Sequence, residues 1–271
     1  MGKAMTIVDI SRHLTMDYLE PSNVSQYRIN FYNNQPFPHI ILDNLFSEEL
    51  LSSMNKEFEE SRIYDWNYID DGRQFRKESR TNQKLKPAAQ TYYNLIYSGL
   101  FVEFVENITG IKGLICDPML LNGGLHELPP GGKFDPHLDV NRHLVSKLNS
   151  KLTLITYLSR NWDPSYGGLL QLWDSNEDCK VEIVPYFGRT VAFLQTAHSI
   201  HGVTQVGPNK KRRSAIAYYY VTDEKPVDFY HGTVFISKLS KRSKLVNLIK
   251  YAMPPFVSHF YRTVKDKLGP R

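Results

Sequence analysis

Short segments with the composition of β-strands follow one another between residues 114 and 222. They are rich in Val, Ile, Leu, Thr and Tyr, and turns that contain Gly, Pro, Asn or Asp separate them. The segments are LICDPML, GGLHEL, KLTLITYL, GGLLQLWD, CKVEIV, RTVAFLQT, HGVTQV and RRSAIAYYYVT. A series of this kind is typical of a double-sheet jelly roll, also called a double-stranded β-helix.

Helical patterns precede these strands. PFPHIILDNLF predicts a strand that leads into a helix capped at Ser47, because SEELLSSMNKEFEES spaces its apolar residues at helical intervals. A second helix is expected over 87–107, and the polar, aromatic stretch 64–84, with a turn at Asp71-Gly72, predicts a hairpin or a mobile loop. Helices first and strands afterwards favour an α+β, mainly β fold in which N-terminal helices support one sheet.

The length of 271 residues allows one large domain with appendages. We expect an N-terminal extension over 1–35, a jelly-roll domain over 36–224 and a basic, helical C-terminal extension over 225–271. Residues 231–271 hold nine Lys or Arg and one acid, a balance of +8 against +5 for the whole chain. This tail predicts two helices broken at Pro254-Pro255, which pack on the domain or on a second copy of the chain in a homodimer, or contact an anionic membrane or an acidic partner.

Other features place the chain in a broad class. Two cysteines, Cys116 and Cys179, cannot form a disulfide framework, and the opening MGKAMTIVDISRHL lacks the apolar core of a signal peptide. We therefore expect a cytoplasmic protein without a membrane span. The start MGKAMT fits a myristoylation pattern, but that pattern is short and common. Because no nucleic-acid-binding module is recognisable, no nucleic-acid partner is expected.

The segment DPHLDVNRH, residues 135–143, gathers two histidines, two aspartates and an arginine. In a strand, side chains alternate between the two faces, so His137 and Asp139 would point in the same direction. Their imidazole and carboxylate groups could then bind one metal ion. A His-x-Asp pair by itself is equally typical of an ion pair at the end of a strand.

A second cluster over 196–220 adds a further histidine, either His198 or His201. A jelly roll brings such distant strands side by side, so this histidine could reach the same ion. Two histidines and one carboxylate on one face of an octahedron are the ligand set of non-haem Fe(II) oxygenases.

The last predicted strand carries arginine and hydroxyl side chains. Alternation along RRSAIAYYYVT puts Arg212 and Ser214 on one face and Arg213 on the other. A buried arginine without a partner is costly, so an arginine inside the barrel would hold an anion by charge-assisted hydrogen bonds. Strand parity with Ser214 favours Arg212, and Arg213 remains the alternative.

The order His137-x-Asp139, His201 and Arg212-x-Ser214 resembles that of the iron(II)- and 2-oxoglutarate-dependent dioxygenases, specifically their prolyl 4-hydroxylase-like branch. PFPHIILDNLFSEELL, YLSRNWDPSYGGLLQLWD and VEIVPYFGRTVAFLQTAHSIHGVTQV are similar to further segments of that branch. The resemblance covers roughly residues 36–224. It implies hydroxylation of an unactivated C-H bond with release of succinate and CO2.

The resemblance also implies the metal ligands and cofactors. His137, Asp139 and His201 would bind Fe(II) at the catalytic centre, and His201, unlike His198, is followed by Gly-Val as in the family. The implied co-substrates are 2-oxoglutarate and O2, with ascorbate as an expected reductant. Related halogenases replace the carboxylate ligand with a small residue, so Asp139 favours hydroxylation.

By the same resemblance, Arg212 and Ser214 would hold the far carboxylate of 2-oxoglutarate. Tyr157 matches a tyrosine that bonds this carboxylate in the hypoxia-sensing hydroxylases. The sequence departs from the family at Leu128, because a tyrosine usually stands nine residues before the first iron ligand.

Several side chains near these motifs have two interpretations. His126 and His143 are expected on the substrate side or at the surface. Asn141 and Arg142 could reach a substrate or belong to a solvated loop. Either the leucines or the polar and aromatic residues of LLQLW, residues 169–173, face the barrel.

The substrate is expected to be a peptidyl group or a small molecule, such as a prolyl residue, a free amino acid, a sugar or another metabolite. The stretch 64–84 would form a lid over the opening, where Arg73, Arg76 and Arg80 hint at a negatively charged substrate, or a plain solvated hairpin. The rival hypothesis is a catalytically inactive jelly roll that binds a sugar or a peptide.

Overall fold

The computed structural model describes residues 10–59, 66–81, 84–222 and 231–236. Its helices are α1 (Pro21–Asn33), α2 (Glu48–Glu59), α3 (Pro87–Ile96) and α4 (Gly99–Thr109), with short 3-10 helices η1 (Ile10–His13), η2 (Met16–Leu19) and η4 (Pro164–Tyr166). None of the helices in these ranges has the length and apolar character needed to cross a membrane. Cys116 and Cys179 are both free thiols.

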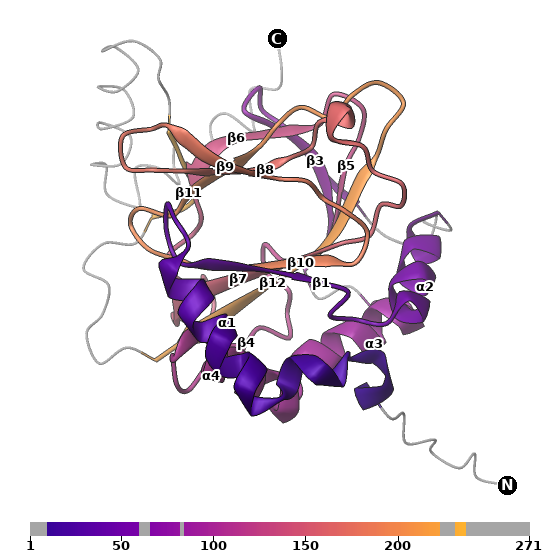
Figure 1. Cartoon of the computed structure of the whole chain (residues 1–271). Coiled ribbons are helices and arrows are strands. Elements are labelled where there is room, and N and C mark those ends of the chain that lie inside the picture. The colour runs from indigo at the N-terminus through magenta and orange to yellow at the C-terminus, as the bar shows by residue number, and fades with distance from the viewer. Residues whose placement is uncertain (1–9, 60–65, 82–83, 223–230, 237–271) are drawn as a thin grey trace, which may run out of the picture.

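The strands form one antiparallel sheet that folds over on itself (Figure 1). Its strands are β1 (His39–Asp43), β2 (Trp66–Asp70), β3 (Gln74–Ser79), β4 (Ile115–Cys116), β5 (Gly124–Leu128), β6 (Lys133–Leu138), β7 (Asn149–Tyr157), β8 (Leu170–Trp173), β9 (Cys179–Ile183), β10 (Arg189–Leu194), β11 (Ile200–Val203), β12 (Arg212–Val221) and β13 (Val234–Phe235). The order is β1-β10-β7-β12-β5-β3-β6-β11-β8-β9. The layer with β7, β10 and β12 faces the layer with β6, β8 and β11, which confirms the predicted jelly roll (Figure 1).

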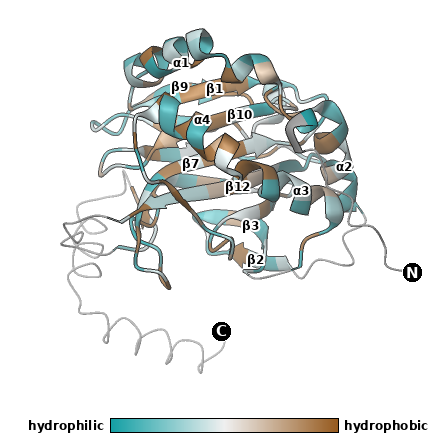
Figure 2. Ribbon diagram, turned by 90° about the horizontal axis from the view of Figure 1, so that it is seen from below, coloured by the Kyte–Doolittle hydropathy of each residue, from teal (hydrophilic) through white to brown (hydrophobic). Residues whose placement is uncertain are grey.

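The helices lie together on the outer face of the layer that contains β1, β10, β7 and β12 (Figures 1 and 2). A large apolar cluster fills the space between the helices and this layer of the sheet. Two buried hydroxyl groups tie α3 to the sheet: Tyr92 donates to Thr156 Oγ1 at 2.8 Å, and Tyr219 of β12 donates to the carbonyl of Ile96 at 2.8 Å. The sheet layer that carries part of the functional site is therefore fixed from behind.

A second apolar cluster occupies the inside of the barrel. Strand alternation decides which side chains enter it. On β8, Leu170 and Leu172 are buried in this cluster, whereas Gln171 and Trp173 are only half-buried and lie on the other face. The leucines are thus the pair that faces the barrel.

Alternation on β12 also separates its two arginines. Arg212 is only 3% exposed, whereas Arg213 lies on the other face and donates from Nε to Glu127 Oε2 at 2.9 Å. Lys77 Nζ lies 2.7 Å from Glu127 Oε1, because Lys77, Glu127 and Arg213 are register neighbours on β3, β5 and β12. Burial alone would raise the pKa of Glu127, but these two cations lower it.

The structure corrects the helices expected from the sequence. The single helix predicted over 87–107 is wrong, because α3 ends at Ile96 and α4 begins at Gly99. Ser98 separates them and caps α4 by accepting a hydrogen bond from the Phe101 amide at 3.3 Å. Helix α1 was not predicted; it buries only Phe31 and so shows no apolar stripe in the sequence.

The stretch 64–84 contains the predicted hairpin, formed by β2 and β3. The lid expectation is wrong for β3, because this strand also pairs with β5 and β6 and belongs to the barrel. Within the predicted C-terminal extension, β13 pairs with β6 and adds to the sheet. The predicted helices of the tail lie in 237–271, outside the described residues, and the proposed domain boundaries stay predictions.

Glu127→Ala is expected to lower the free energy of unfolding by about 3 kcal/mol, because it removes the buried carboxylate that Lys77 and Arg213 share. Urea unfolding followed by fluorescence measures this change. Glu59→Ala is the matched control: Glu59 Oε1 lies 3.4 Å from Arg213 Nη1 but its side chain is 64% exposed, so a change below about 1 kcal/mol is expected. Equal losses of unfolding free energy in the two variants would contradict the stabilising role of the buried Glu127 carboxylate.

Candidate functional site

Two histidines from remote segments stand opposite each other on paired strands. His137 of β6 is the register partner of His201 of β11, and their ring centroids lie 4.3 Å apart. The ring of Phe134 stacks on His137 at 3.7 Å, and Phe193 lies 4.7 Å from the ring of His201. Aromatic packing therefore holds both imidazoles in fixed orientations.

Backbone carbonyls set the tautomers of these rings. Nδ1 of His137 donates to the Asp135 carbonyl at 2.9 Å, and Nδ1 of His201 donates to the Ser199 carbonyl at 3.0 Å. Since a carbonyl oxygen only accepts, Nδ1 of each ring carries a proton and Nε2 is the atom left to bind a metal ion. Burial lowers the pKa of His201 to about 4, so this ring is neutral at pH 7. Nε2 of His137 is buried without a hydrogen-bond partner among the described residues.

Asp139 completes the group. Its Oδ1 lies 3.4 Å from Nε2 of His137, and its Oδ2 lies 3.5 Å from Nε2 of His201. Burial would raise the pKa of Asp139, but His201, His137 and Arg76 outweigh burial and hold it well below its usual range. Two imidazole lone pairs and an ionised carboxylate, with one atom from each within 4.8 Å of the others, fit a divalent metal ion in a two-histidine, one-carboxylate site.

Two residues that the sequence did not single out orient the carboxylate. Gln195 Nε2 donates to Asp139 Oδ2 at 3.2 Å and to Thr153 Oγ1 at 2.7 Å, and Thr153 Oγ1 lies 3.4 Å from the same carboxylate oxygen. Such partners fix the direction of a metal ligand. The signal for Thr153 was present in the sequence, because it shares a face of β7 with Tyr157.

The geometry agrees with the choice of His201 over His198. His198 is exposed in the turn before β11, and the structure does not bring it to His137 or Asp139. His201 is the histidine that reaches both.

Three polar groups predicted to hold 2-oxoglutarate share the inner face of the barrel. Ser214 of β12 is the register partner of Tyr157 on β7. Arg212 lies two residues before Ser214 on the same face, with its Cζ 4.7 Å from the Tyr157 ring centroid. Tyr157 Oη, Ser214 Oγ and Arg212 Nε are buried without hydrogen-bond partners among the described residues. Buried polar atoms left unpaired are costly, so this arrangement fits a ligand with several acceptor oxygens, such as a dicarboxylate.

Two neighbours shape the space around Tyr157, Arg212 and Ser214, which we call the anion pocket. Leu128, at the position where the resemblance implies a tyrosine, is the register partner of Arg212, and its side chain offers no hydrogen bond. The hydroxyl comes instead from Tyr157 on the other side of β12. Gly168 leaves room for the arginine, because a Cβ there would lie 3.0 Å from Arg212 Cδ and 3.2 Å from Trp162, so a side chain would displace the arginine.

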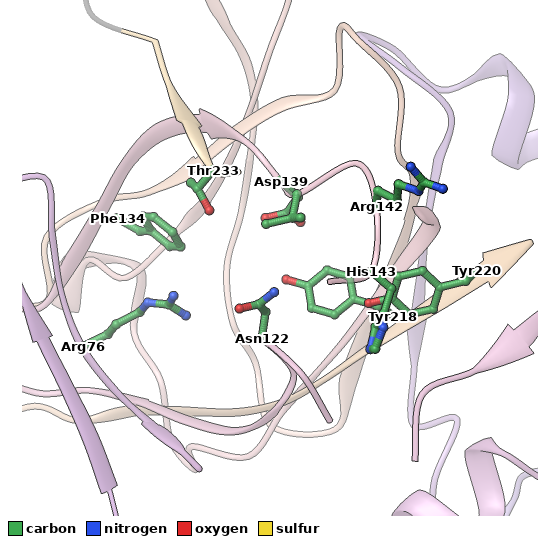
Figure 3. A pocket seen from close by; sticks show the side chains of 10 residues that line it. Arg76, Asn122, Phe134, Asp139, Arg142, His143, Tyr218, Tyr220 and Thr233 are labelled. Atoms are coloured by element: carbon green, nitrogen blue, oxygen red, sulfur yellow. The ribbon is translucent and has the colours of Figure 1, made fainter. Parts of the chain in front are cut away.

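A polar pocket borders the candidate metal ligands (Figure 3). Its lining comes from β3, β6, β12 and the adjoining loops and consists of Arg76, Asn122, Phe134, Asp139, Val140, Arg142, His143, Tyr218, Tyr220 and Thr233. Because Asp139 belongs both to this lining and to the metal group, a molecule in the pocket would lie beside the metal ion.

The structure also gives the positions of the other residues that had two interpretations from the sequence. His143 lines it and is buried, with Nε2 3.3 Å from Asp117 Oδ2. His126 is buried behind Arg76, so a surface position is wrong for both histidines. Asn141 accepts a hydrogen bond from the His231 amide at 3.0 Å, and Arg142 lines the pocket.

Residues 123–221 match the family model of the 2OG-Fe(II) oxygenase superfamily. This segment contains all six predicted site residues. No curated protein sequence matches this chain.

Solved structures of low sequence identity share the fold. A prolyl-4-hydroxylase from Pseudomonas putida has a TM-score of 0.56 at 15% identity, over 74% of this chain and 100% of that chain. A prolyl hydroxylase from Trichoplax adhaerens, in complex with a hypoxia inducible factor oxygen degradation domain peptide fragment, has a TM-score of 0.57 at 17% identity, over 76% and 93%. A 2OG-Fe(II) oxygenase family oxidoreductase from Burkholderia pseudomallei has a TM-score of 0.54 at 15% identity, over 75% and 93%.

His201→Ala is expected to weaken Mn(II) binding by about 100-fold or more, because it removes a metal ligand. His198→Ala is the matched control and should bind Mn(II) like the natural chain. The free Mn(II) signal in electron paramagnetic resonance titrations measures both affinities. A large loss in His198→Ala, or none in His201→Ala, would contradict the proposed ligand set.

The metal-free protein is expected to lose stability as the pH falls from about 6.5 towards 3. Burial, followed by the charge of Arg76, lowers the pKa of His126 to about 3, whereas the unfolded residue takes up a proton near its ordinary value. The unfolded state then binds more protons in this window, so His126 contributes a loss of about 1 kcal/mol per pH unit. Urea unfolding at several pH values should give a shallower slope for His126→Gln; an unchanged slope would refute this origin.

Proposed function

We propose that the chain is a member of the 2OG-Fe(II) oxygenase superfamily that hydroxylates a C-H bond of a peptidyl or small-molecule substrate with 2-oxoglutarate and O2. The observation that carries this proposal is the meeting of His137, Asp139 and His201 in one barrel with a buried arginine, Arg212. When bound, Fe(II) supplies the redox chemistry by which O2 converts 2-oxoglutarate to succinate and CO2 and hydroxylates the substrate.

The protein's part in this reaction is to hold the metal ligands and exclude water. Nε2 of His137, Nε2 of His201 and a carboxylate oxygen of Asp139 would hold the ion on one face, so the other positions stay open for 2-oxoglutarate and O2. Gln195 and Thr153 keep the carboxylate directed at the ion. Because these ligands are prearranged, binding the metal requires little reorganisation.

The anion pocket would position 2-oxoglutarate. Arg212 would pair with the carboxylate far from the metal, and Ser214 and Tyr157 would donate hydrogen bonds to it. Burial raises the pKa of Tyr157, so its hydroxyl keeps the proton that it donates. The apolar cluster inside the barrel lines the space around these groups and lowers access of water.

A catalytically inactive binding protein is the rival hypothesis, and the site disfavours it. A sugar or peptide binder has no need for two imidazoles and an ionised carboxylate aimed at one point. The peptide complex of the Trichoplax adhaerens structure supports a peptidyl substrate as one candidate class for this chain.

Purified protein with Fe(II) and ascorbate is expected to convert 2-oxoglutarate slowly to succinate without an added substrate. His137→Ala should abolish this turnover, because it removes a metal ligand. Arg212→Gln should raise the KM for 2-oxoglutarate by about 10- to 100-fold, since it removes charge-assisted hydrogen bonds. Succinate release measured by chromatography gives both values.

Lys211→Gln is the control for Arg212, because Lys211 is the preceding residue and is exposed. It should leave the KM for 2-oxoglutarate unchanged. Absence of succinate from the natural chain under all metal and pH conditions would favour the binding protein instead.

A further inference from the structure

Arg76 extends from β3 into the pocket beside Asp139 (Figure 3). Its side chain is only 13% exposed, compared with 44% for the surface residue Arg160. Strand β3 lies between β5 and β6, so this arginine is part of the barrel wall and not of a solvated hairpin. A largely buried guanidinium next to a reaction centre requires an explanation beyond solubility.

The guanidinium of Arg76 is held in one orientation. Nε donates to Gln74 Oε1 at 3.0 Å, and Nη1 donates to His126 Nδ1 at 3.1 Å and lies 2.9 Å from Glu78 Oε2. Its Cζ stacks over the Phe134 ring at 4.7 Å. Nη2 has no partner within the described part of the chain, and it is the donor that remains for a ligand.

His126 supports this orientation as a neutral ring. Its Nε2 lies 3.2 Å from the Gly123 carbonyl, which only accepts, so Nε2 carries the proton and Nδ1 accepts from Arg76. The same burial that lowers the pKa of His126 keeps the ring uncharged at pH 7, and it does not oppose the guanidinium. The arginine is therefore prearranged before any ligand binds.

Other polar side chains point into the same space (Figure 3). The Asn122 amide, the Tyr218 hydroxyl and the Thr233 hydroxyl line the pocket, and no described residue is a hydrogen-bond partner for them. Burial, together with the charge of Asp139, raises the pKa of Tyr218, so its hydroxyl is a donor at pH 7. With Nη2 of Arg76, the pocket thus presents several donors that the protein itself leaves unused.

The donors that line the pocket favour an anion over a neutral group. The lining contains the cations Arg76 and Arg142 and one carboxylate, Asp139, whose charge the metal ion would offset. Glu78 Oε2 lies 2.9 Å from Nη1 of Arg76 and offsets part of its charge, and Glu78 Oε1 accepts from Asn67 at 3.3 Å, so the preference depends on the unused donors of the pocket. A carboxylate accepts from several donors at once, whereas an amide also needs acceptors for its own N-H groups.

We infer that this pocket contains a subsite for a carboxylate of the substrate, with Arg76 as the residue that determines this specificity and Asn122 and Tyr218 as supporting donors. The inference rests on the proposed function, because it places that carboxylate beside the metal ion. It narrows the substrate class to molecules that carry an acidic group near the carbon to be hydroxylated.

The test compares two small probes, N-acetylglycine and its neutral counterpart N-acetylglycinamide, on the protein loaded with Mn(II) and the inert analogue N-oxalylglycine. Relaxation of the probe protons by Mn(II), measured by NMR, reports binding close to the metal. The natural chain is expected to bind the acid at least about tenfold more tightly than the amide. Arg76→Gln should remove this preference, and Arg76→Lys should restore part of it.

Arg160→Gln is the control, because it removes an exposed arginine outside the pocket and should keep the full preference. Equal binding of both probes to the natural chain, no binding of either, or a preference that survives in Arg76→Gln would each overturn the carboxylate subsite. Loading with Mn(II) and N-oxalylglycine is measured first. A natural chain that does not load contradicts the proposed function itself, so the two failures are distinguishable.

Discussion

The antiparallel register between β6 and β11 is the constraint on which the site depends. It puts His137 opposite His201, and a slip by one residue would turn one ring to the other face of the sheet. Gly202 permits this approach, because a Cβ there would lie 3.1 Å from both the Phe134 carbonyl oxygen and the Pro136 nitrogen. The glycine after the second histidine therefore has a steric reason: the two strands must come close at the metal site.

Alternation along β12 gives neighbouring arginines opposite roles. Arg213 faces the helices, where Glu127 neutralises it and fixes the strand to β5. Arg212 faces the barrel, where no carboxylate of the described residues pairs with it. The ion pair of Arg213 with Glu127 on one face of β12 thus helps to position Arg212 on the other face. The stability of the sheet and the geometry of the anion pocket therefore depend on the same strand.

The candidate site combines aromatic surroundings with a polar pocket. The proposed histidine ligands lie among aromatic rings, which hold the imidazoles in fixed orientations. The space beside them is polar and rich in donors, because Arg76 and Tyr218 enter it from strands on either side of β5. A wall of this kind suits a polar substrate better than a purely apolar one, although the fold is shared with prolyl hydroxylases.

The sequence alone determined what strand alternation controls: the jelly-roll class, the common face of His137 and Asp139, and the common face of Arg212 and Ser214. This information is local, because alternation has a period of two residues. Tertiary structure decided the partner of each strand: it brought His201 opposite His137, brought Gln195 to Asp139 and placed Arg76 in the barrel wall. These relations depend on register between strands far apart in the chain, which packing fixes and no local pattern encodes.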